Sequence, residues 1–188
     1  MRIFCDRQAL ADAVNNVQRA VASKSALPAL EGILLKASAS SLFLAGYDME
    51  LGITTTIEAQ VNEPGEIVLT AKLFSEILRR MPADEIYIES NEKNNTVIRC
   101  GNSEFTIMGF SSVDYPELPT INNGAAMTMP QNVLKSMIRQ TLFAVAQTDT
   151  RPVHTGVQFE LGNRSLRLVA VDGSRLAMRS EPINSDEE

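Results

Sequence analysis

The chain has 188 residues, 44% of them hydrophobic and 21% charged, with a formal net charge of −6. This composition is typical of a globular protein, and no apolar run approaches the ~20 residues of a membrane span. Cys5 and Cys100 lie in apolar, strand-like stretches, which favours free thiols in a reducing cytoplasm over a secreted disulfide scaffold.

The first segment predicts a strand, a helix and three further strands. After a short opening strand, residues 6–23 carry apolar side chains at helical spacing, and Asp6 is a good N-cap. Short aliphatic stretches separated by polar turns follow at 33–35, 42–44 and 51–57, as is typical of strands. The side chains that we expect this helix to bury are Leu10, Ala13, Val14, Val17 and Val21.

The same order recurs after residue 66. A strand at 67–69 leads into a helix that Pro82 stops, and strands are predicted at 86–88, 96–99 and 105–107. The apolar side chains that we expect on one side of this second helix are Leu73, Phe74, Ile77, Leu78 and Met81.

A third repeat starts near Met127. Its helix is predicted to begin with Pro130 at the first helical position, and strands are predicted at 157–161, at 166–171 and on past 176. The side chains that we expect this helix to bury are Leu134, Met137, Ile138, Leu142 and Val145.

The first and third repeats align without a gap at an offset of 124 residues. Leu10 matches Leu134, and Asp48 matches Asp172. A register held over some 40 residues indicates an array or ring of similar units. Each unit packs one amphipathic helix on an antiparallel sheet, so the predicted fold is α+β, with repeated β-α-β-β-β units and the helices on one face.

The repeats suggest a division of the chain into 1–119, with two units, and 120–188, with one. The stretch 114–119 has two prolines and no periodicity, which indicates a linker. A lone unit would leave an open sheet edge, and residues 184–188 form an acidic tail. We therefore expect that the rest of a second domain is missing from this sequence.

Charge is unevenly distributed between helices and strands. The segments 6–24, 71–81 and 130–147, which we call the helix layer, hold eight basic and three acidic residues, a net charge of +5. The remainder carries −11. A positive helix layer is suited to binding phosphate without reading bases. The eight basic residues are Arg7, Arg19, Lys24, Lys72, Arg79, Arg80, Lys135 and Arg139.

The chain resembles a known family along residues 1–183. The runs 69–78, 114–119, 151–157 and 171–177 are similar to those of the bacterial DNA polymerase III beta subunit, the beta sliding clamp. The resemblance implies the DNA clamp fold, in which three domains of two units each close as a head-to-tail homodimer with the helices inside. It also implies a processivity factor that encircles double-stranded DNA and catalyses nothing, without cofactor or metal.

The resemblance implies DNA contacts at several positions. Lys24 and Lys72 match family positions that touch DNA, as does the loop 147–149 after the third helix. Family members can carry an aromatic pair just beyond this loop, where this chain has Pro152 and Val153; Pro152 either contributes to DNA contact or only sets the entry to a strand, as Pro28 does. The predicted DNA-binding residues are Lys24, Lys72, Arg79, Arg80, Lys135, Arg139, Gln147 and Thr148.

The family also binds short peptides of the polymerase III alpha subunit, the clamp loader and repair polymerases. Half of that pocket matches residues of this chain, although a core role is the alternative for Leu176. For the dimer edge the resemblance points to Phe105 and Ile107, for which burial in the core is the ordinary explanation. The matching pocket residues are His154, Val171, Gly173, Ser174, Arg175 and Leu176.

Two other classes of function remain as alternatives. Asp48 and Asp172 could be paired carboxylates of an enzyme, but their equivalent places in two repeats favour structural turn residues. His154 has no nucleophile and acid at a recognisable spacing, and no cluster has metal-ligand spacing. The other alternative is a protein-interaction module without DNA encirclement.

Overall fold

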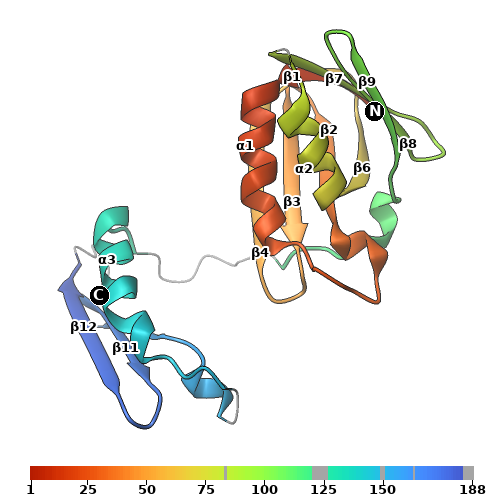
Figure 1. Cartoon of the computed structure of the whole chain (residues 1–188). Coiled ribbons are helices and arrows are strands. Elements are labelled where there is room, and N and C mark those ends of the chain that lie inside the picture. Colours follow the sequence, from red (N-terminus) through yellow and green to blue (C-terminus); the bar gives the residue numbers. More distant parts are fainter. Residues whose placement is uncertain (83, 120–126, 149–150, 163, 184–188) are drawn as a thin grey trace. The chain divides into compact units, whose positions relative to one another are not determined.

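The computed structural model describes residues 1–82, 84–119, 127–148, 151–162 and 164–183. It divides the chain into two compact units, Met1–Thr120 and Ile121–Glu188, which we call the N-terminal unit and the C-terminal unit. The first two sequence repeats lie in the N-terminal unit and the third lies in the C-terminal unit (Figure 1). No helix within the described ranges has the length and apolar character needed to cross a bilayer.

The first two repeats have the predicted order of elements, with one additional short strand between them. The first repeat comprises β1 (Arg2–Asp6), α1 (Arg7–Val17), β2 (Gly32–Ser38), β3 (Ser41–Tyr47) and β4 (Gly52–Glu58). The additional strand is β5 (Gln60–Glu63). The second repeat comprises β6 (Gly65–Thr70), α2 (Ala71–Arg80), β7 (Glu85–Ser90), β8 (Asn95–Cys100) and β9 (Ser103–Met108).

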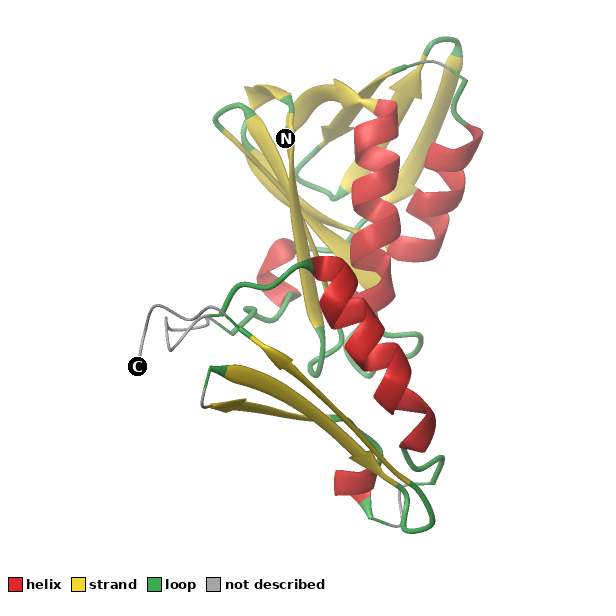
Figure 2. Cartoon of the chain, turned by 90° about the vertical axis from the view of Figure 1, so that its left-hand side faces the viewer, coloured by secondary structure: helices red, strands yellow, loops and turns green. Residues whose placement is uncertain are grey.

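The two repeats of the N-terminal unit are joined through their strands. Its antiparallel sheets have the strand orders β5-β1-β7-β8-β9 and β4-β3-β2-β6. Each sheet contains strands of both repeats, because β1 pairs with β7 and β2 pairs with β6. The helices α1 and α2 lie side by side on one face of these sheets (Figure 1, Figure 2). The predicted α+β arrangement with helices on one face is confirmed.

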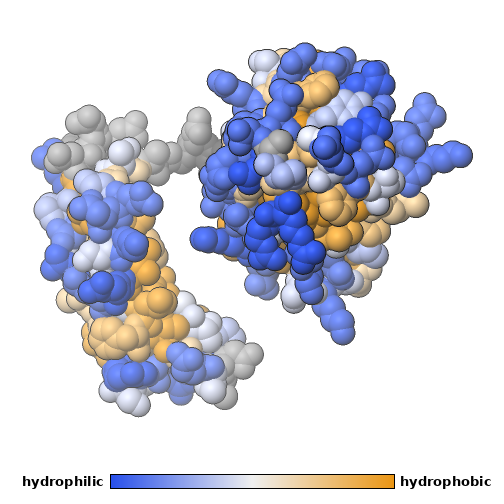
Figure 3. Space-filling view, turned by 45° about the horizontal axis from the view of Figure 1, so that its top comes forward, coloured by the Kyte–Doolittle hydropathy of each residue, from blue (hydrophilic) through white to orange (hydrophobic). Residues whose placement is uncertain are grey.

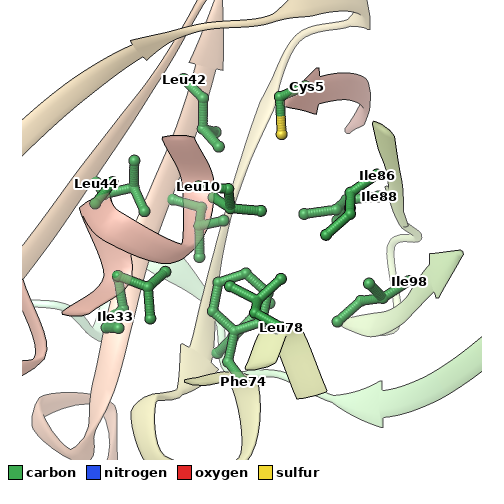
Figure 4. Close-up of a cluster of buried hydrophobic side chains, with 14 of the residues drawn as sticks. Cys5, Leu10, Ile33, Leu42, Leu44, Phe74, Leu78, Ile86, Ile88 and Ile98 are labelled. Carbon is green, nitrogen blue, oxygen red and sulfur yellow. The ribbon is translucent and has the colours of Figure 1, made fainter. Parts of the chain in front are cut away.

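One continuous hydrophobic core fills the space between the helices and both sheets (Figure 4). Leu10 of α1 and Phe74 of α2 are fully buried in it, together with Leu44 of β3 and Ile88 of β7. Burying a side chain of this size contributes about 1.5–3 kcal/mol, so the core fixes α1 and α2 firmly against the strands. Cys5 and Cys100 are buried and form no disulfide, as predicted, and burial raises the pKa of the Cys5 thiol to about 12.

The C-terminal unit is a smaller version of the same design. Its helix α3 (Gln131–Thr141) packs on β11 (Ser165–Val171) and β12 (Leu176–Pro182). The strand β10 (Gln158–Gly162) pairs with β11 at the edge of the sheet β10-β11-β12. Its core contains Met137, and the predicted burial of Val145 is confirmed.

The helix starts agree with the sequence to within one residue. The carboxylate of Asp6 accepts a hydrogen bond from the backbone N–H of Ala9 at 2.6 Å, which confirms Asp6 as the N-cap of α1. Pro130 is itself an N-cap with extended backbone, and α3 begins at Gln131. The expectation that Pro130 is the first helical residue is therefore wrong by one position.

Two expectations about the helices are wrong, each for a tertiary reason. Leu73 is exposed. The buried face of α2 consists of Ala71, Phe74, Ile77 and Leu78, and it is narrower than predicted. Leu142 is exposed because α3 ends at Thr141, which is buried and hydrogen-bonded to the carbonyl of Met137, and a 3₁₀ turn follows. Residues 127–129, which precede α3, form no strand, so the third repeat lacks an equivalent of β1 among the described residues.

The predicted linker begins as an ordered part of the N-terminal unit. Residues Ser112–Asp114 form a 3₁₀ turn, and the next side chain, Tyr115, is buried beside Tyr47. The Tyr115 hydroxyl donates a hydrogen bond to the carbonyl of Ala45 at 3.3 Å. The end of the 114–119 stretch also packs here, since Leu118 contacts the same cluster.

Candidate nucleic-acid interface and partner pocket

The exposed side of α1 and α2 carries the predicted cations of the N-terminal unit. Lys72 at the start of α2 and Arg79 and Arg80 in its last turn are exposed. Lys24 is also exposed, in the bend that follows the 3₁₀ turn Gln18–Ala20. The amphipathic pattern of α2 explains the arrangement, because the core takes the opposite side of the helix.

Ion pairing separates the cations of the helix layer from those of the strands. The ion pairs among the described residues all join residues of strands or of the turns between them. They include Arg2 with Glu63 and Glu89, and Lys36 with Glu66. None of the eight helix-layer cations pairs with a described acid. Their charge is therefore available to an external anion.

A groove runs between α1 and α2 on this cationic side. It has a volume of ≈ 300 Å³ and includes Arg7 and Arg79. Its other polar lining residues are Gln8, Asn15, Gln18 and Ser75. The sequence pattern predicted the charges but not the groove, because the lateral packing of α1 against α2 is a tertiary contact.

In the C-terminal unit the predicted residues also lie on the exposed side of the helix. Lys135 and Arg139 of α3 are exposed, as are Gln147 and Thr148 in the following loop. Asp149, which belongs to the same predicted segment, lies outside the described residues. Pro152 begins the 3₁₀ turn Pro152–His154, just as Pro28 begins the turn Pro28–Glu31. Both prolines thus start a turn that precedes a strand.

A hollow of ≈ 320 Å³ brings part of the predicted pocket together with the loop after α3. Thr148, His154 and Gly173 all line it. The sequence did not single out the three further lining residues, Ala146, Arg151 and Asp172, as members of this site. Arg151 is the N-cap of the 3₁₀ turn that Pro152 begins, and its place in the family-like run 151–157 is the signal that the sequence carried for it.

The turn between β11 and β12 holds the remaining pocket residues in a fixed geometry. One carboxylate oxygen of Asp172 accepts hydrogen bonds from the backbone N–H groups of Ser174 (2.9 Å) and Arg175 (2.8 Å). The other accepts from Nε (2.9 Å) and Nη2 (2.6 Å) of the Arg175 guanidinium. These backbone and side-chain donors lower the pKa of Asp172 to about 2.

Gly173 and Leu176 have different roles in this turn. Gly173 has a φ of +91° with open space around it, so the backbone conformation, rather than crowding, requires glycine there. Leu176 is 67% exposed and pairs across the turn with the half-buried Val171. The alternative that Leu176 is a core residue is wrong.

Asp48 shows that the Asp172 turn is a structural feature of the repeat. Its carboxylate accepts hydrogen bonds from the backbone N–H groups of Glu50 (2.9 Å) and Leu51 (2.7 Å), which lowers its pKa. The structural turn role expected for both aspartates is confirmed. No group of His, Cys, Asp and Glu residues with the arrangement of a metal site occurs within the described ranges.

The two residues suggested for a dimer edge differ in exposure. Both lie on β9, which is the edge strand of its sheet. Phe105 is 39% exposed, whereas Ile107 is 7% exposed and belongs to the core of the N-terminal unit. Phe105 is therefore an available apolar contact of this edge, together with Met108, which is 66% exposed, and Ile107 holds the strand in place.

Comparison with known families gives matches along nearly the whole chain. Residues 1–119 match the family model of the DNA polymerase III beta subunit, N-terminal domain, and residues 128–188 match that of its central domain. Among curated proteins, the beta sliding clamp of Halalkalibacterium halodurans is 38% identical over all of this chain and 52% of its own length. The chain thus spans about half the length of the curated relatives it matches.

Solved structures agree with this result. The DNA polymerase sliding clamp of Bacillus subtilis matches with a TM-score of 0.96 and 34% identity, over 100% of this chain and 51% of that one. A putative DNA polymerase III beta subunit of Eubacterium rectale matches with a TM-score of 0.95 and 37% identity, over 98% of this chain and 51% of that one. The fold predicted from the repeats and the resemblance is confirmed.

Proposed function

The chain belongs to the DNA polymerase III beta subunit family, the beta sliding clamps, and on that premise we propose that it forms part of a ring around double-stranded DNA. The ring is a processivity factor: it holds the polymerase to its template without reading the sequence. It acts as a non-catalytic subunit of the DNA polymerase. We place it in the bacterial cytoplasm, where the chromosome lies.

The observation that carries this proposal is the segregation of free cations to the helix layer. Phosphate contacts from Lys and Arg give binding that is independent of sequence and sensitive to salt. The strand cations are neutralised by neighbouring acids, so the sheet side of each unit offers less attraction to DNA. A negative outer side also disfavours binding of DNA to the wrong face.

Weak phosphate contacts explain how a clamp can bind DNA and still move along it. Contacts to base edges differ from one base pair to the next, whereas phosphates repeat regularly along the duplex. Long, flexible Lys and Arg side chains on the exposed side of a helix exchange between successive phosphates at low cost. The residues we assign to these contacts are Lys24, Lys72, Arg79, Arg80, Lys135, Arg139, Gln147 and Thr148.

We assign the hollow and the adjacent β11–β12 turn to half of a pocket for partner peptides. His154 and Gly173 line its polar part, and the exposed Leu176 gives an apolar wall. Arg175 is preorganised by Asp172, so less conformational entropy is lost when a peptide binds. The proposed partners are the polymerase III alpha subunit, the clamp loader and repair polymerases. The pocket residues are His154, Val171, Gly173, Ser174, Arg175 and Leu176.

For the assembly we propose that residues 1–119 form the first clamp domain and 120–188 the first half of the second. The edge strand β9, with the exposed Phe105, faces the third domain of another subunit in the head-to-tail homodimer. Main-chain pairing at a sheet edge gives such a contact direction and register. Ile107 supports the edge from within the core.

A topological experiment tests this function. A ring assembled from chains that contain residues 1–188 is loaded on nicked circular plasmid, and the bound fraction is measured before and after the plasmid is cut. We expect the ring to stay on the circle and to leave the linear form. Equal retention on both forms would contradict encirclement and would favour a plain interaction module.

A further inference from the structure

The groove between α1 and α2 combines cationic walls with an apolar floor. Arg7 of α1 and Arg79 of α2 line it, and no acidic residue is among its described lining residues. Val14 and Leu78 also line it, and both belong to the core of the N-terminal unit. In Figure 3 the visible face of this unit is largely hydrophilic, with apolar surface showing between the polar side chains. A cleft with charge of one sign and low-dielectric walls concentrates the electric field, so it attracts anions more strongly than a flat surface does.

The two arginines lie at the same end of the groove, one on each helix. Arg7 is the first residue of α1, and its backbone N–H donates a hydrogen bond to the carbonyl of Asp84 at 2.7 Å, just beyond the end of α2. Arg79 belongs to the last turn of α2. Because α1 and α2 pack on each other and share one core, the positions of the two arginines relative to each other are fixed before any ligand binds.

Most of the hydrogen-bond donors in this groove are not used within the N-terminal unit. Among the described residues the Arg7 guanidinium donates only to Oε1 of Gln8, at 3.3 Å, and the side chains of Arg79 and Ser75 make no hydrogen bond. Asn15 accepts a hydrogen bond through Oδ1, so its amide NH₂ is left to donate. A guanidinium carries five N–H donors and binds a phosphate through two parallel hydrogen bonds. The groove therefore offers donors from both helices to one anion.

The third repeat carries positive charge on the same face of its helix. At the offset of 124 residues, the groove-lining positions Ala11 and Asn15 of α1 correspond to Lys135 and Arg139 of α3. Both of these cations are exposed. Arg7 corresponds to the neutral Gln131, so the two helices carry their cations at different positions of one face. The charge of this face, rather than a particular contact within the fold, is what the two repeats share.

We propose that the groove between α1 and α2 seats one backbone phosphate of duplex DNA, with Arg7 and Arg79 donating to its oxygens from the two helices. Asn15 and Ser75 add neutral donors to the same phosphate. This inference rests on the proposed function and adds Arg7 to its DNA contacts. The donors reach phosphate oxygens and no base edge, so the seat is the same for every sequence.

Salt dependence of DNA binding tests the seat with a matched pair of variants of the full chain. Arg7→Gln and Arg19→Gln each remove one positive charge from the helix layer. Arg19 is exposed in the 3₁₀ turn Gln18–Ala20 and does not line the groove. The equilibrium constant K for random-sequence duplex DNA is measured as a function of salt concentration.

We expect Arg7→Gln to reduce the magnitude of the slope of log K against log salt concentration by about 0.9, the value of one phosphate contact. Arg19→Gln should keep the wild-type slope. Equal slopes for the two variants would overturn the seat, because the attraction would then be diffuse, and would leave the DNA-binding function standing. A wild-type chain that binds duplex DNA without salt dependence would contradict the proposed function itself.

Nuclear magnetic resonance of the arginine Nε–H groups tests the same seat in the unaltered chain and identifies the source of the phosphate. A short duplex is expected to shift the Nε–H signals of Arg7 and Arg79 and to leave that of Arg19 in place. Inorganic phosphate at the same concentration of phosphate groups should leave all three signals unshifted. Shifts of equal size with inorganic phosphate would overturn the proposal in favour of a free-anion site, and a duplex that shifts Arg19 as much as Arg7 would also overturn it.

Discussion

Asp172 holds Arg175 in place through both carboxylate oxygens, with a closest separation of 2.6 Å between Oδ2 and Nη2 of the guanidinium. The same carboxylate also caps the backbone of the turn. One side chain therefore shapes the loop and orients the cation that we assign to the peptide pocket. Asp48 caps the equivalent turn of the first repeat, where Leu51 stands in place of Arg175.

This difference between the two turns gives a test with an internal control. Asp172→Asn is expected to weaken binding of a clamp-binding peptide of the polymerase severalfold, because the neutral amide cannot hold the Arg175 guanidinium through charge-assisted hydrogen bonds. The affinity is measured by fluorescence anisotropy on the chain, alongside Arg175→Ala. Asp48→Asn perturbs the equivalent turn of the first repeat, which contributes no residue to the proposed pocket, and is expected to leave the affinity unchanged. Equal peptide affinities for Asp172→Asn and Asp48→Asn would contradict the claim that Asp172 orients Arg175 for peptide binding.

The lowered pKa of Asp172 predicts a specific acid dependence of stability. Its folded pKa of about 2 lies below the ordinary 3.8, so the ionised form stabilises the fold, fully so above pH 3.8. This contribution declines as the pH falls from about 4 and is lost on passing through 2. Urea unfolding followed by circular dichroism should show the wild type losing more stability than Asp172→Asn over this range. Parallel curves would show that the carboxylate is not coupled to folding.

Gly46 sets how closely α1 approaches β3. A Cβ at this position would lie 2.0 Å from the carbonyl oxygen of Val17, which is backbone and cannot rotate away. Gly46→Ala is expected to destabilise the N-terminal unit by roughly 1–3 kcal/mol, as overpacking does. Gly52→Ala is the control, because its Cβ would meet the end of the flexible Leu118 side chain at 3.0 Å and the Tyr47 ring at an ordinary contact distance of 3.5 Å.

Tyrosine fluorescence isolates this effect, since Tyr47, Tyr87 and Tyr115 all lie in the N-terminal unit and the chain has no Trp. The urea midpoint of Gly46→Ala should fall well below that of Gly52→Ala. Similar midpoints for the two variants would show that α1 can shift away from β3 without cost.

Local patterns predicted the elements of this fold well, because helix and strand periods are properties of neighbouring residues. The Asp6 cap and the buried face of α1 follow from such patterns. The exposure of Leu142 does not, because it depends on where α3 gives way to a 3₁₀ turn. Residues 127–129 have the alternation of a strand but no partner among the described residues, and a strand needs partners for its backbone groups.

The candidate site was predictable in its charges and less so in its geometry. The excess of Lys and Arg in three helical segments is visible in the sequence. Their freedom from ion pairs depends on which acids the folded strands bring within reach. Arg151 and Asp172 join the hollow because a 3₁₀ turn and a strand turn meet there, and no local pattern encodes that meeting.

The central claim is that free cations of the helix layer bind DNA phosphates without reading sequence. We compare two double variants that make the same change in net charge. One is Arg79→Glu, Arg80→Glu on α2, and the other is Lys36→Glu, Lys93→Glu on the strand side. The equilibrium constant for random-sequence duplex DNA is measured as a function of salt.

For the wild type we predict that log K falls linearly with log salt concentration. For the α2 variant the magnitude of this slope should be smaller by about 2, because each lost phosphate contact reduces it by about 0.9. The strand-side variant should keep the wild-type slope. Equal effects of the two double variants would contradict the claim, because the position of the charges on the helix layer would then not matter.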